Sequence, residues 1–358
     1  MLDSQMLVDF LNQGLNNLYY PCYAAAVGNQ NEVTFRAIGG HRALYPQPLP
    51  LSEDALFDMA SMTKIIGTTS AALRLIDRGE LRLDDTLDRF FECCYGKEKT
   101  TVRQLMTHTS GLSAHLPLWQ SEPSPDTATD AILRSSLCAA PDTKVIYSCM
   151  GYILLGKLLE RLCGESLDNI VQREVLTPLG MSRTTYCPPR DAVCVTTEKK
   201  AGREDYICGH VHDENAHFLG GVSGNAGLFC PLDDVITFAQ MLSRRAEGYL
   251  SRELFELAVR DLTPFDPEES RGLGFHLYRD GTYPGGSRMS RGSYGHTGYT
   301  GTTLYVDAQS GVFCLLLTNR VHLGRDTPNY FSHRRAFFDL VFDKTQPAFD
   351  FLLPEVDI

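Results

Sequence analysis

Ser61-Met62-Thr63-Lys64 is the stretch of the chain that says most about its fold, because it opens an apolar helical pattern that Gly79 can end. The hydroxyl and the amine stand three residues apart, a spacing that puts both on one face of a helix. A serine beside a desolvated lysine can become an activated nucleophile, and backbone N–H groups at a helix start can stabilise an oxyanion. Alone the motif is weak, because S-x-x-K arises roughly once by chance in a chain of this size. A solvated helix start is the alternative.

Two further motifs lie downstream. Tyr147-Ser148-Cys149 comes directly before an apolar helical pattern that begins at Tyr152. A tyrosine can act as a base where an ammonium stabilises its phenolate, although a lone tyrosine is more often a packed aromatic. The third motif is Gly295-His296-Thr297-Gly298-Tyr299-Thr300-Gly301, on an expected edge strand. Its glycines permit close backbone approach, so a substrate could pair with this strand.

In this order the three motifs resemble those of the serine β-lactamase and penicillin-binding protein family. The similar branch contains class C β-lactamases, D-alanyl-D-alanine carboxypeptidases and related esterases, which carry S-x-x-K, then Y-x-N, then K-T-G or H-T-G. The spacing of the motifs fits that family, and so do residues 105–112, 177–181 and 221–229. The resemblance extends from residue 22 to the expected final helix.

The resemblance implies a role for each motif residue. Ser61 would be the acylated nucleophile, Lys64 would help to deprotonate it, and Tyr147 would share the base role and return a proton to the leaving group. The backbone N–H groups of Ser61 and Tyr299 would form the oxyanion hole. The implied substrate-binding residues are Cys149, His296, Thr297 and Gly298. The resemblance implies no cofactor and no metal.

Two residues depart from the family pattern. Cys149 stands where the family usually has Asn or Asp, and a thiol is a weak hydrogen-bonding group. His296 stands where many members have lysine, and with an ordinary pKa near ~6.5 it would gain charge only below neutral pH. We therefore expect short-chain esters to be preferred over substrates with a free carboxylate, unless Arg288 or Arg291 supplies the missing charge.

A competing interpretation is a zinc site in Cys208-Gly209-His210-Val211-His212-Asp213, with His217 nearby. On a strand, Cys208, His210 and His212 would share one face, which suits zinc. The run lacks the H-x-H-x-D-H pattern of metallo-hydrolases. Residues 212–216 also resemble a segment of the H-T-G branch, where no metal is implied. We favour a loop near the rim of the active site.

Composition limits the partners. The 358 residues are 43% hydrophobic and 22% charged, as in an ordinary globular protein, and a formal net charge of -11 disfavours nucleic acid. The longest apolar run, residues 312–317, is far shorter than the ~20 residues that span a bilayer, and the N-terminus lacks a basic export region. The 11 cysteines form no C-x-x-C motif. We expect a soluble cytoplasmic protein with reduced thiols and no membrane partner.

Hydrophobic periodicity predicts the fold class. The expected elements are a helix near 7–15, strands at 22–27 and 33–37, helices through the middle of the chain, strands at 274–278, 301–306 and 312–318, and a last helix at 331–342. We expect an α/β (α+β) fold with one mixed, mostly antiparallel sheet, flanked by N- and C-terminal helices, and an inserted helical lobe. Residues 1–60 and 218–358 would form the sheet domain and residues 61–217 the mainly helical lobe.

The sequence therefore predicts a serine hydrolase that acts through an acyl-enzyme on an ester or amide, in a small molecule or short peptide. A D-alanyl-D-alanine carboxypeptidase or a β-lactamase is an alternative within the same chemistry. A non-catalytic binding or sensor protein on the same fold is an alternative of another class, with Cys149 as the mark of lost activity.

Overall fold

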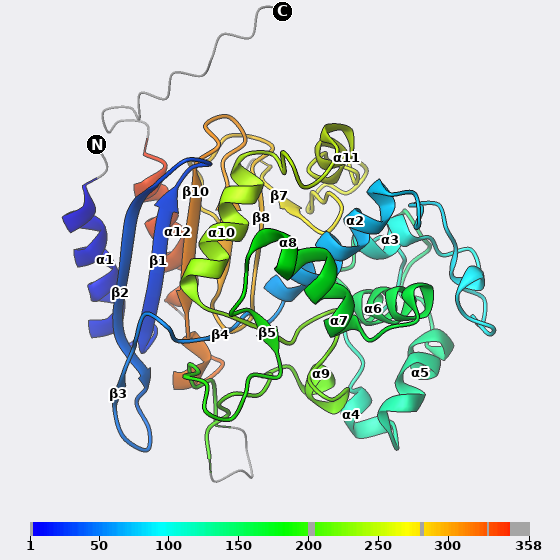
Figure 1. Ribbon diagram of the computed structural model, residues 1–358, viewed down its shortest axis with the longest axis horizontal. Helices are drawn as coiled ribbons and strands as arrows, with labels where there is room; N and C mark the ends of the chain where they lie inside the picture. The colour runs from blue at the N-terminus through cyan, green and yellow to red at the C-terminus, as the bar shows by residue number, and fades with distance from the viewer. Residues whose placement is uncertain (1–2, 200–204, 280–282, 328, 344–358) are drawn as a thin grey trace, which may run out of the picture.

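The computed structural model describes residues 3–199, 205–279, 283–327 and 329–343. At its centre lies a seven-stranded sheet in which every neighbouring pair of strands is antiparallel (Figure 1). Across the sheet the strands are β3 (Leu49–Pro50), β2 (Val33–Ala43), β1 (Cys22–Gly28), β10 (Phe313–Thr318), β9 (Thr303–Val306), β8 (Tyr294–Thr297) and β7 (His276–Leu277). The N-terminal hairpin thus pairs with the C-terminal strands, as the sequence pattern predicts.

Strands β1 and β10 form the middle of the sheet because both are apolar along most of their length. Every residue of both strands is buried. Successive side chains point to opposite faces. Ala24 and Leu315 accordingly enter one hydrophobic core, and Ala25 and Leu316 enter another. The sheet therefore needs a cover on both faces.

The terminal helices cover one face of the sheet and α10 covers the other (Figure 1). Helix α1 (Ser4–Asn16) packs against α12 (Tyr330–Val341) and against β2. Helix α10 (Leu232–Ser243) packs against β1, β9 and β10. This arrangement confirms the predicted flanking of the sheet by the two terminal helices.

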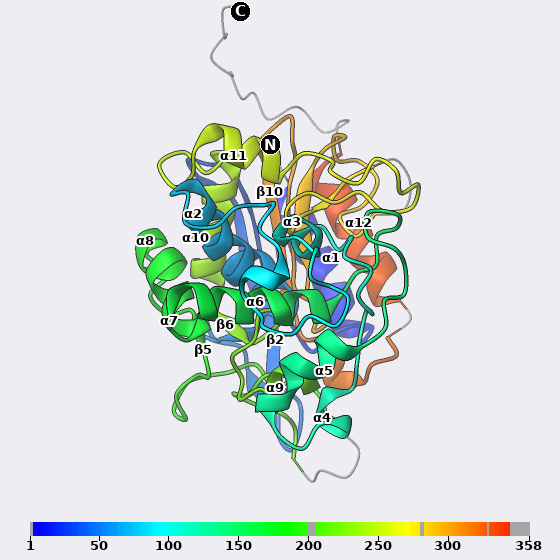
Figure 2. The same cartoon turned by 90° about the vertical axis from the view of Figure 1, so that its right-hand side faces the viewer.

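The helices from the middle of the chain gather on the α10 side of the sheet, the side that faces the viewer in Figure 2. A π-helical turn, η1 (Lys64–Thr69), leads into α2 (Ser70–Asp77). The other helical elements are η2 (Leu87–Arg89), α3 (Val102–Met106), α4 (Leu118–Ser121), η3 (Pro125–Thr127), α5 (Ala128–Arg134), α6 (Cys149–Cys163), α7 (Leu167–Val171), η4 (Gln172–Leu176), α8 (Thr177–Leu179), α9 (Glu214–Phe218), α11 (Arg252–Ala258) and η5 (Arg320–Leu323). In the described part of the chain, no helix is long and apolar enough to cross a membrane.

A second sheet, which the sequence pattern did not reveal, holds the segment before Ser61. Strands β4 (Phe57–Asp58) and β5 (Thr185–Tyr186) both pair with β6 (Leu228–Cys230). Strands of two or three residues carry too little periodicity to be recognised in a sequence.

Some element boundaries differ from those expected. Gly164 ends α6, with φ 68°. Helix α10 has Pro231 as its N-cap, and both Asp233 and Asp234 lie within its first turn. The strand expected at 274–278 is reduced to the two residues of β7, because Gly274 has φ 83°, a left-handed conformation that interrupts a strand.

Candidate active site

Ser61 follows a turn whose backbone is fixed by hydrogen bonds to a buried carboxylate. The preceding residue, Ala60, has φ 45°, in the left-handed region that non-glycine residues rarely adopt. The buried carboxylate of Asp58 holds this turn, because it accepts hydrogen bonds from the N–H of Ala60 at 2.8 Å and from the N–H of His212 at 2.7 Å. As a result Ser61 is half-buried, while its neighbours Ala60 and Met62 are buried.

Lys64 lies one helical turn after Ser61 and is fully buried. Its Nζ donates to Ser61 Oγ at 3.0 Å and to the Asn225 carbonyl at 2.9 Å. The same Nζ lies 3.6 Å from Cys149 Sγ. Burial lowers the pKa of the ammonium, but negative charge at Cys149 and at Tyr147 raises it, and the net result is a pKa above the ordinary lysine value. A cationic Lys64 can stabilise a phenolate or an alkoxide beside it.

Tyr147 stands among positive charges just before α6. Lys64 Nζ lies 5.1 Å, and the guanidinium carbon of Arg271 5.3 Å, from the centre of its ring. The ring of His108 packs against it at 4.6 Å between centres. Ser148 fixes this position, because its N–H donates to His108 Nδ1 at 3.0 Å and its hydroxyl caps α6. Tyr147 therefore lies beside the Ser61 and Lys64 pair, where it can serve as an acid–base group.

Strand β8 is not the edge strand that its glycines suggest. Strand β7 lies outside it but pairs with it only at Tyr294 and Gly295. Within the described residues, the outer side of β8 has no strand partner from His296 onward. The expectation that β8 is an edge strand is therefore wrong, because β7 lies outside it. The outer side of the His296-Thr297-Gly298 motif is still available to a substrate.

The turn after β8 is packed against the turn before Ser61. Gly298 approaches Met59 so closely that a Cβ atom on it would lie 2.4 Å from the Met59 carbonyl oxygen. The Thr302 hydroxyl donates to the same carbonyl at 3.1 Å. Within the described residues, the backbone N–H groups of Ser61 and Tyr299 donate no hydrogen bond. Both groups are therefore available to an oxyanion.

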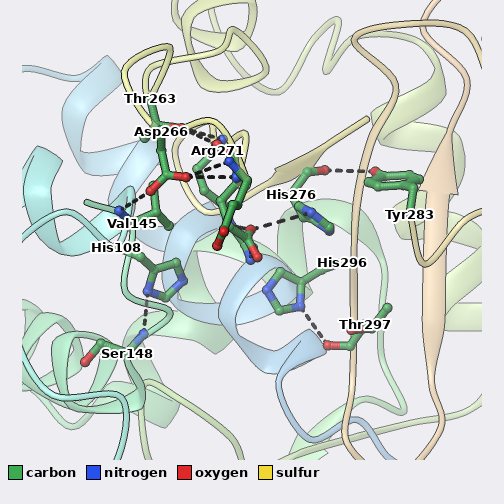
Figure 3. A network of polar contacts seen from close by, with 12 residues as sticks. His108, Val145, Ser148, Thr263, Asp266, Arg271, His276, Tyr283, His296 and Thr297 are labelled. Carbon is green, nitrogen blue, oxygen red and sulfur yellow. Dashed lines mark hydrogen bonds and ion pairs between the residues drawn. The ribbon is translucent and has the colours of Figure 1, made fainter. Parts of the chain in front are cut away.

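His296 is buried and carries its proton on Nδ1, because this atom lies 2.7 Å from the Thr297 carbonyl, which can only accept a hydrogen bond. Burial and the positive charges of Arg271 and Lys64 lower the pKa of His296 to about 3. Figure 3 shows the Arg271 side chain above the rings of His108 and His296. The expectation that His296 gains charge just below neutral pH is wrong, because the folded protein keeps it neutral there.

The positive charge near His296 does not come from Arg288 or Arg291, the two arginines that the sequence suggested. Arg288 pairs with Asp343 at 2.7 Å, and neither Arg288 nor Arg291 lines the cavity beside His296. That cavity, of about 380 Å³, lies next to Ser61, and we call it the arginine cavity because it is lined by Arg271, Arg320 and Arg334. We expected short-chain esters to be preferred because positive charge would be missing beside His296. Three arginines line that cavity, so this reason does not hold.

A second cavity, of about 440 Å³, shares Ser61, Tyr147 and Tyr299 with the arginine cavity. Its lining includes Cys149 and the half-exposed side chain of Trp119, the single tryptophan of the chain. The two cavities therefore meet at Ser61, where the two halves of a cleaved substrate could lie.

The segment considered as a zinc site forms part of the rim of the second cavity. It is a loop rather than a strand, with φ 71° at Gly209, so the alternation that would align its three candidate ligands is missing. His212 instead pairs with Glu198 at 3.0 Å and stacks on Tyr299. Among the residues that the structure describes, no three side chains converge in a group that could hold a metal ion.

The residues named from the three motifs come together around Ser61. They are Ser61, Lys64, Tyr147, Cys149, His296, Thr297, Gly298 and Tyr299. Sequence reasoning missed Asp58, His108 and the arginines of the arginine cavity. An acidic residue three positions before the nucleophile was a visible signal for Asp58, and His108 lies in the segment 105–112 that resembles the family. No local pattern marked the arginines.

Comparison with known proteins decides the family. A family model described as Beta-lactamase matches residues 9–336 of the chain. The chain belongs to the Beta-lactamase family. It is a serine hydrolase of this family, and the hydrogen-bonded pair of Ser61 and Lys64 is the pair that the family resemblance singled out.

Proteins similar to this chain are described with different activities. The chain is 29% identical over 329 residues to the N-acetylmuramyl-L-alanine amidase of Bacillus subtilis (strain 168), covering 80% of this chain and 74% of that protein. It is 28% identical over 345 residues to a protein of Escherichia coli (strain K12) described provisionally as a D-alanyl-D-alanine carboxypeptidase, covering 85% and 79%. The solved structure of EstCE1, described as a hydrolase with promiscuous acyltransferase activity, matches with a TM-score of 0.78 at 20% identity, over 96% of this chain and 100% of that one. This last likeness confirms the predicted fold class.

Proposed function

We propose that the protein hydrolyses an amide or ester through an acyl-enzyme on Ser61. The observation that carries this proposal is the 3.0 Å hydrogen bond from the fully buried Nζ of Lys64 to Ser61 Oγ. Burying an ammonium costs several kcal/mol unless its partners are well placed. A lysine kept in this position is therefore better explained by an activated serine than by a solvated helix start.

In the proposed reaction Ser61 Oγ attacks the carbonyl carbon, and its proton passes to Tyr147, which shares the role of base with Lys64. The negative oxygen of the tetrahedral intermediate accepts hydrogen bonds from the N–H groups of Ser61 and Tyr299. One such donor contributes about 2.7–4 kcal/mol in hydrolases of this type. Tyr147 then protonates the leaving amine or alcohol as the carbonyl–leaving-group bond breaks. Water attacks the acyl-enzyme by the same route and releases the acid.

Small molecules and short peptides fit the dimensions of this site. The two cavities, of about 380 and 440 Å³, each hold a group of the size of one or two amino acids. The amidase and carboxypeptidase relatives support a peptide-like amide, and we place it ahead of a β-lactam. The cytoplasm is the proposed location, which is supported by the 11 cysteines being free thiols.

A binding or sensor protein without turnover is the second candidate, because Cys149 replaces the usual amide at 3.6 Å from Lys64 Nζ. Steady-state assays on a panel of neutral esters and acetylated peptides separate the two candidates. We expect turnover by the wild type and a loss of at least 10³-fold in Ser61→Ala, in line with the loss of a nucleophile. Equal rates in both proteins would contradict the proposed function, and binding without any turnover would favour the sensor.

A further inference from the structure

Two arginines of the arginine cavity are buried without a carboxylate partner. Arg320 is 3% exposed and Arg334 is 6% exposed. Among the described residues, Arg320 donates only to neutral oxygens, the Arg325 carbonyl at 3.0 Å and Thr327 Oγ1 at 3.2 Å. Arg334 Nε is buried with no hydrogen-bond partner. Within the described residues neither guanidinium forms an ion pair, so two buried positive charges lack an anion.

Aromatic rings hold both guanidinium groups in place. The Arg320 guanidinium carbon lies 4.6 Å from the ring centre of Tyr299 and 5.0 Å from that of Phe331. That of Arg334 lies 5.4 Å from the same Phe331 ring. Ring contacts attract a cation but leave its charge uncompensated. Because both arginines share Phe331, which also lines the arginine cavity, both charges are held at the same part of that cavity.

The other charged groups of the arginine cavity do not neutralise Arg320 and Arg334. Arg271 is balanced by Glu269, with 2.7 Å between Nη2 and Oε2. Burial and the nearby guanidinium of Arg271 lower the pKa of both His276 and His296, so both rings are neutral. The arginine cavity therefore carries a net charge of about two positive units, those of Arg320 and Arg334.

We propose that the arginine cavity binds the leaving group of the substrate and that this leaving group is a dianion with two carboxylates. The proposal rests on the proposed function, in which the leaving group lies on the His296 and Thr297 side of Ser61. A guanidinium and a carboxylate form charge-assisted, often bidentate hydrogen bonds, and two carboxylates balance two unpaired guanidiniums. A dianionic phosphate has the same charge and is therefore one arm of the test.

The test compares four peptides with one acetylated alanyl group, made in both stereoisomers, and leaving groups of similar size. Glutamine amide carries no carboxylate, glutamine carries one, glutamate carries two, and phosphoserine amide carries a phosphate. We expect kcat/KM to rise by about 10- to 150-fold with each added carboxylate, the worth of one charge-assisted hydrogen bond. Equal values for glutamine and glutamate, or a higher value for phosphoserine amide than for glutamate, would overturn the dicarboxylate proposal.

Variants assign the effect to the arginines. Arg320→Gln and Arg334→Gln should each lower the ratio of kcat/KM for the glutamate peptide to kcat/KM for the glutamine amide peptide by about 10- to 150-fold. Arg334→Lys, which keeps the charge, should recover part of the loss. Arg288→Gln removes an arginine outside the cavity and should change neither value. Equal losses on all peptides in the Gln variants would show a merely structural role.

The failure of this inference can be told apart from a failure of the proposed function. Turnover of the glutamine amide peptide that depends on Ser61, together with indifference to carboxylates, contradicts only the leaving-group proposal. Where no peptide is turned over, titration calorimetry of Ser61→Ala with the glutamate peptide still tests the cavity. We then expect binding that is at least tenfold weaker in Ser61→Ala/Arg334→Gln, and equal affinity would overturn the proposal.

Discussion

The hydroxyl of Thr300 donates a 2.8 Å hydrogen bond to the carbonyl of Asp58, which joins the turn after β8 to the strand before the nucleophile. These two segments lie far apart in the chain, yet each contributes one N–H group to the proposed oxyanion hole. The relative position of the two donors therefore depends on contacts between side chains and backbone at this junction.

Tyr147→Phe should lower kcat by about 10²–10⁴-fold, the usual worth of a positioned acid–base group. The fold should survive, because the ring contacts with His108 and Lys64 do not need the hydroxyl. Steady-state kinetics on a neutral ester measure the first effect, and thermal unfolding measures the second. An activity equal to that of the wild type would remove Tyr147 from the mechanism.

Gly298→Ala should impair catalysis by moving the oxyanion hole. The added Cβ would meet Thr302 Oγ1 at 2.1 Å and the Met59 carbonyl oxygen at 2.4 Å, so the turn must shift. We expect kcat to fall by about 10²–10³-fold, as when one oxyanion donor is lost.

Gly151→Ala is the matched control for this substitution, because its Cβ would meet its nearest neighbour at 3.8 Å, inside α6. This variant should keep its activity and gain roughly 0.5–1 kcal/mol of stability, since alanine favours a helix. Comparable losses of kcat in both variants would contradict the assignment of Gly298 to the oxyanion hole.

Cys149→Ser should keep kcat within about tenfold of the wild type. Cys149 contacts Lys64 Nζ at 3.6 Å, and a hydroxyl can make a similar or stronger contact with an ammonium. Kinetics on the same ester measure the effect. A complete loss of turnover in this variant would indicate that the thiol, rather than Ser61, is the nucleophile.

The stability of the protein should fall on acidification between pH 6.5 and pH 4. The pKa of His296 is about 3 in the folded protein and near ~6.5 in the unfolded chain, so the unfolded chain binds the proton first as the pH falls. The contribution of neutral His296 is present above pH ~6.5 and is lost by up to about 1.4 kcal/mol per pH unit below it. His108 and His276, whose pKa values are also lowered mainly by burial, act in the same direction.

Urea unfolding at pH 7.5 and pH 5 measures this loss of stability. His296→Gln should lose less stability than the wild type between these two pH values. His41→Gln, which changes an exposed histidine, should lose as much as the wild type does. Three equal losses would show that His296 is not held neutral by the fold.

The parts of the site that could be predicted from the sequence are those with a local pattern. Ser61 and Lys64 share one helical turn, and the glycines around Gly298 indicate a turn there. The arginine cavity could not be foreseen, because Arg271, Arg320 and Arg334 come from the loop before β7, from η5 and from α12. The pKa of His296 could not be predicted from the sequence either, because it depends on burial and on charges from distant segments. The predicted strand boundaries failed at β7, which begins only at His276 because Gly274 is left-handed.

The measurement that tests the central claim most directly is peptide mapping by mass spectrometry after treatment with a fluorophosphonate, a probe that phosphonylates activated serines. We expect one adduct per chain, on the peptide that contains Ser61, and labelling at least 10²-fold slower in Lys64→Met, which removes the ammonium beside the hydroxyl. Ser61→Ala should carry no adduct. A reproducible adduct on another serine, or none on the folded wild type, would contradict the account.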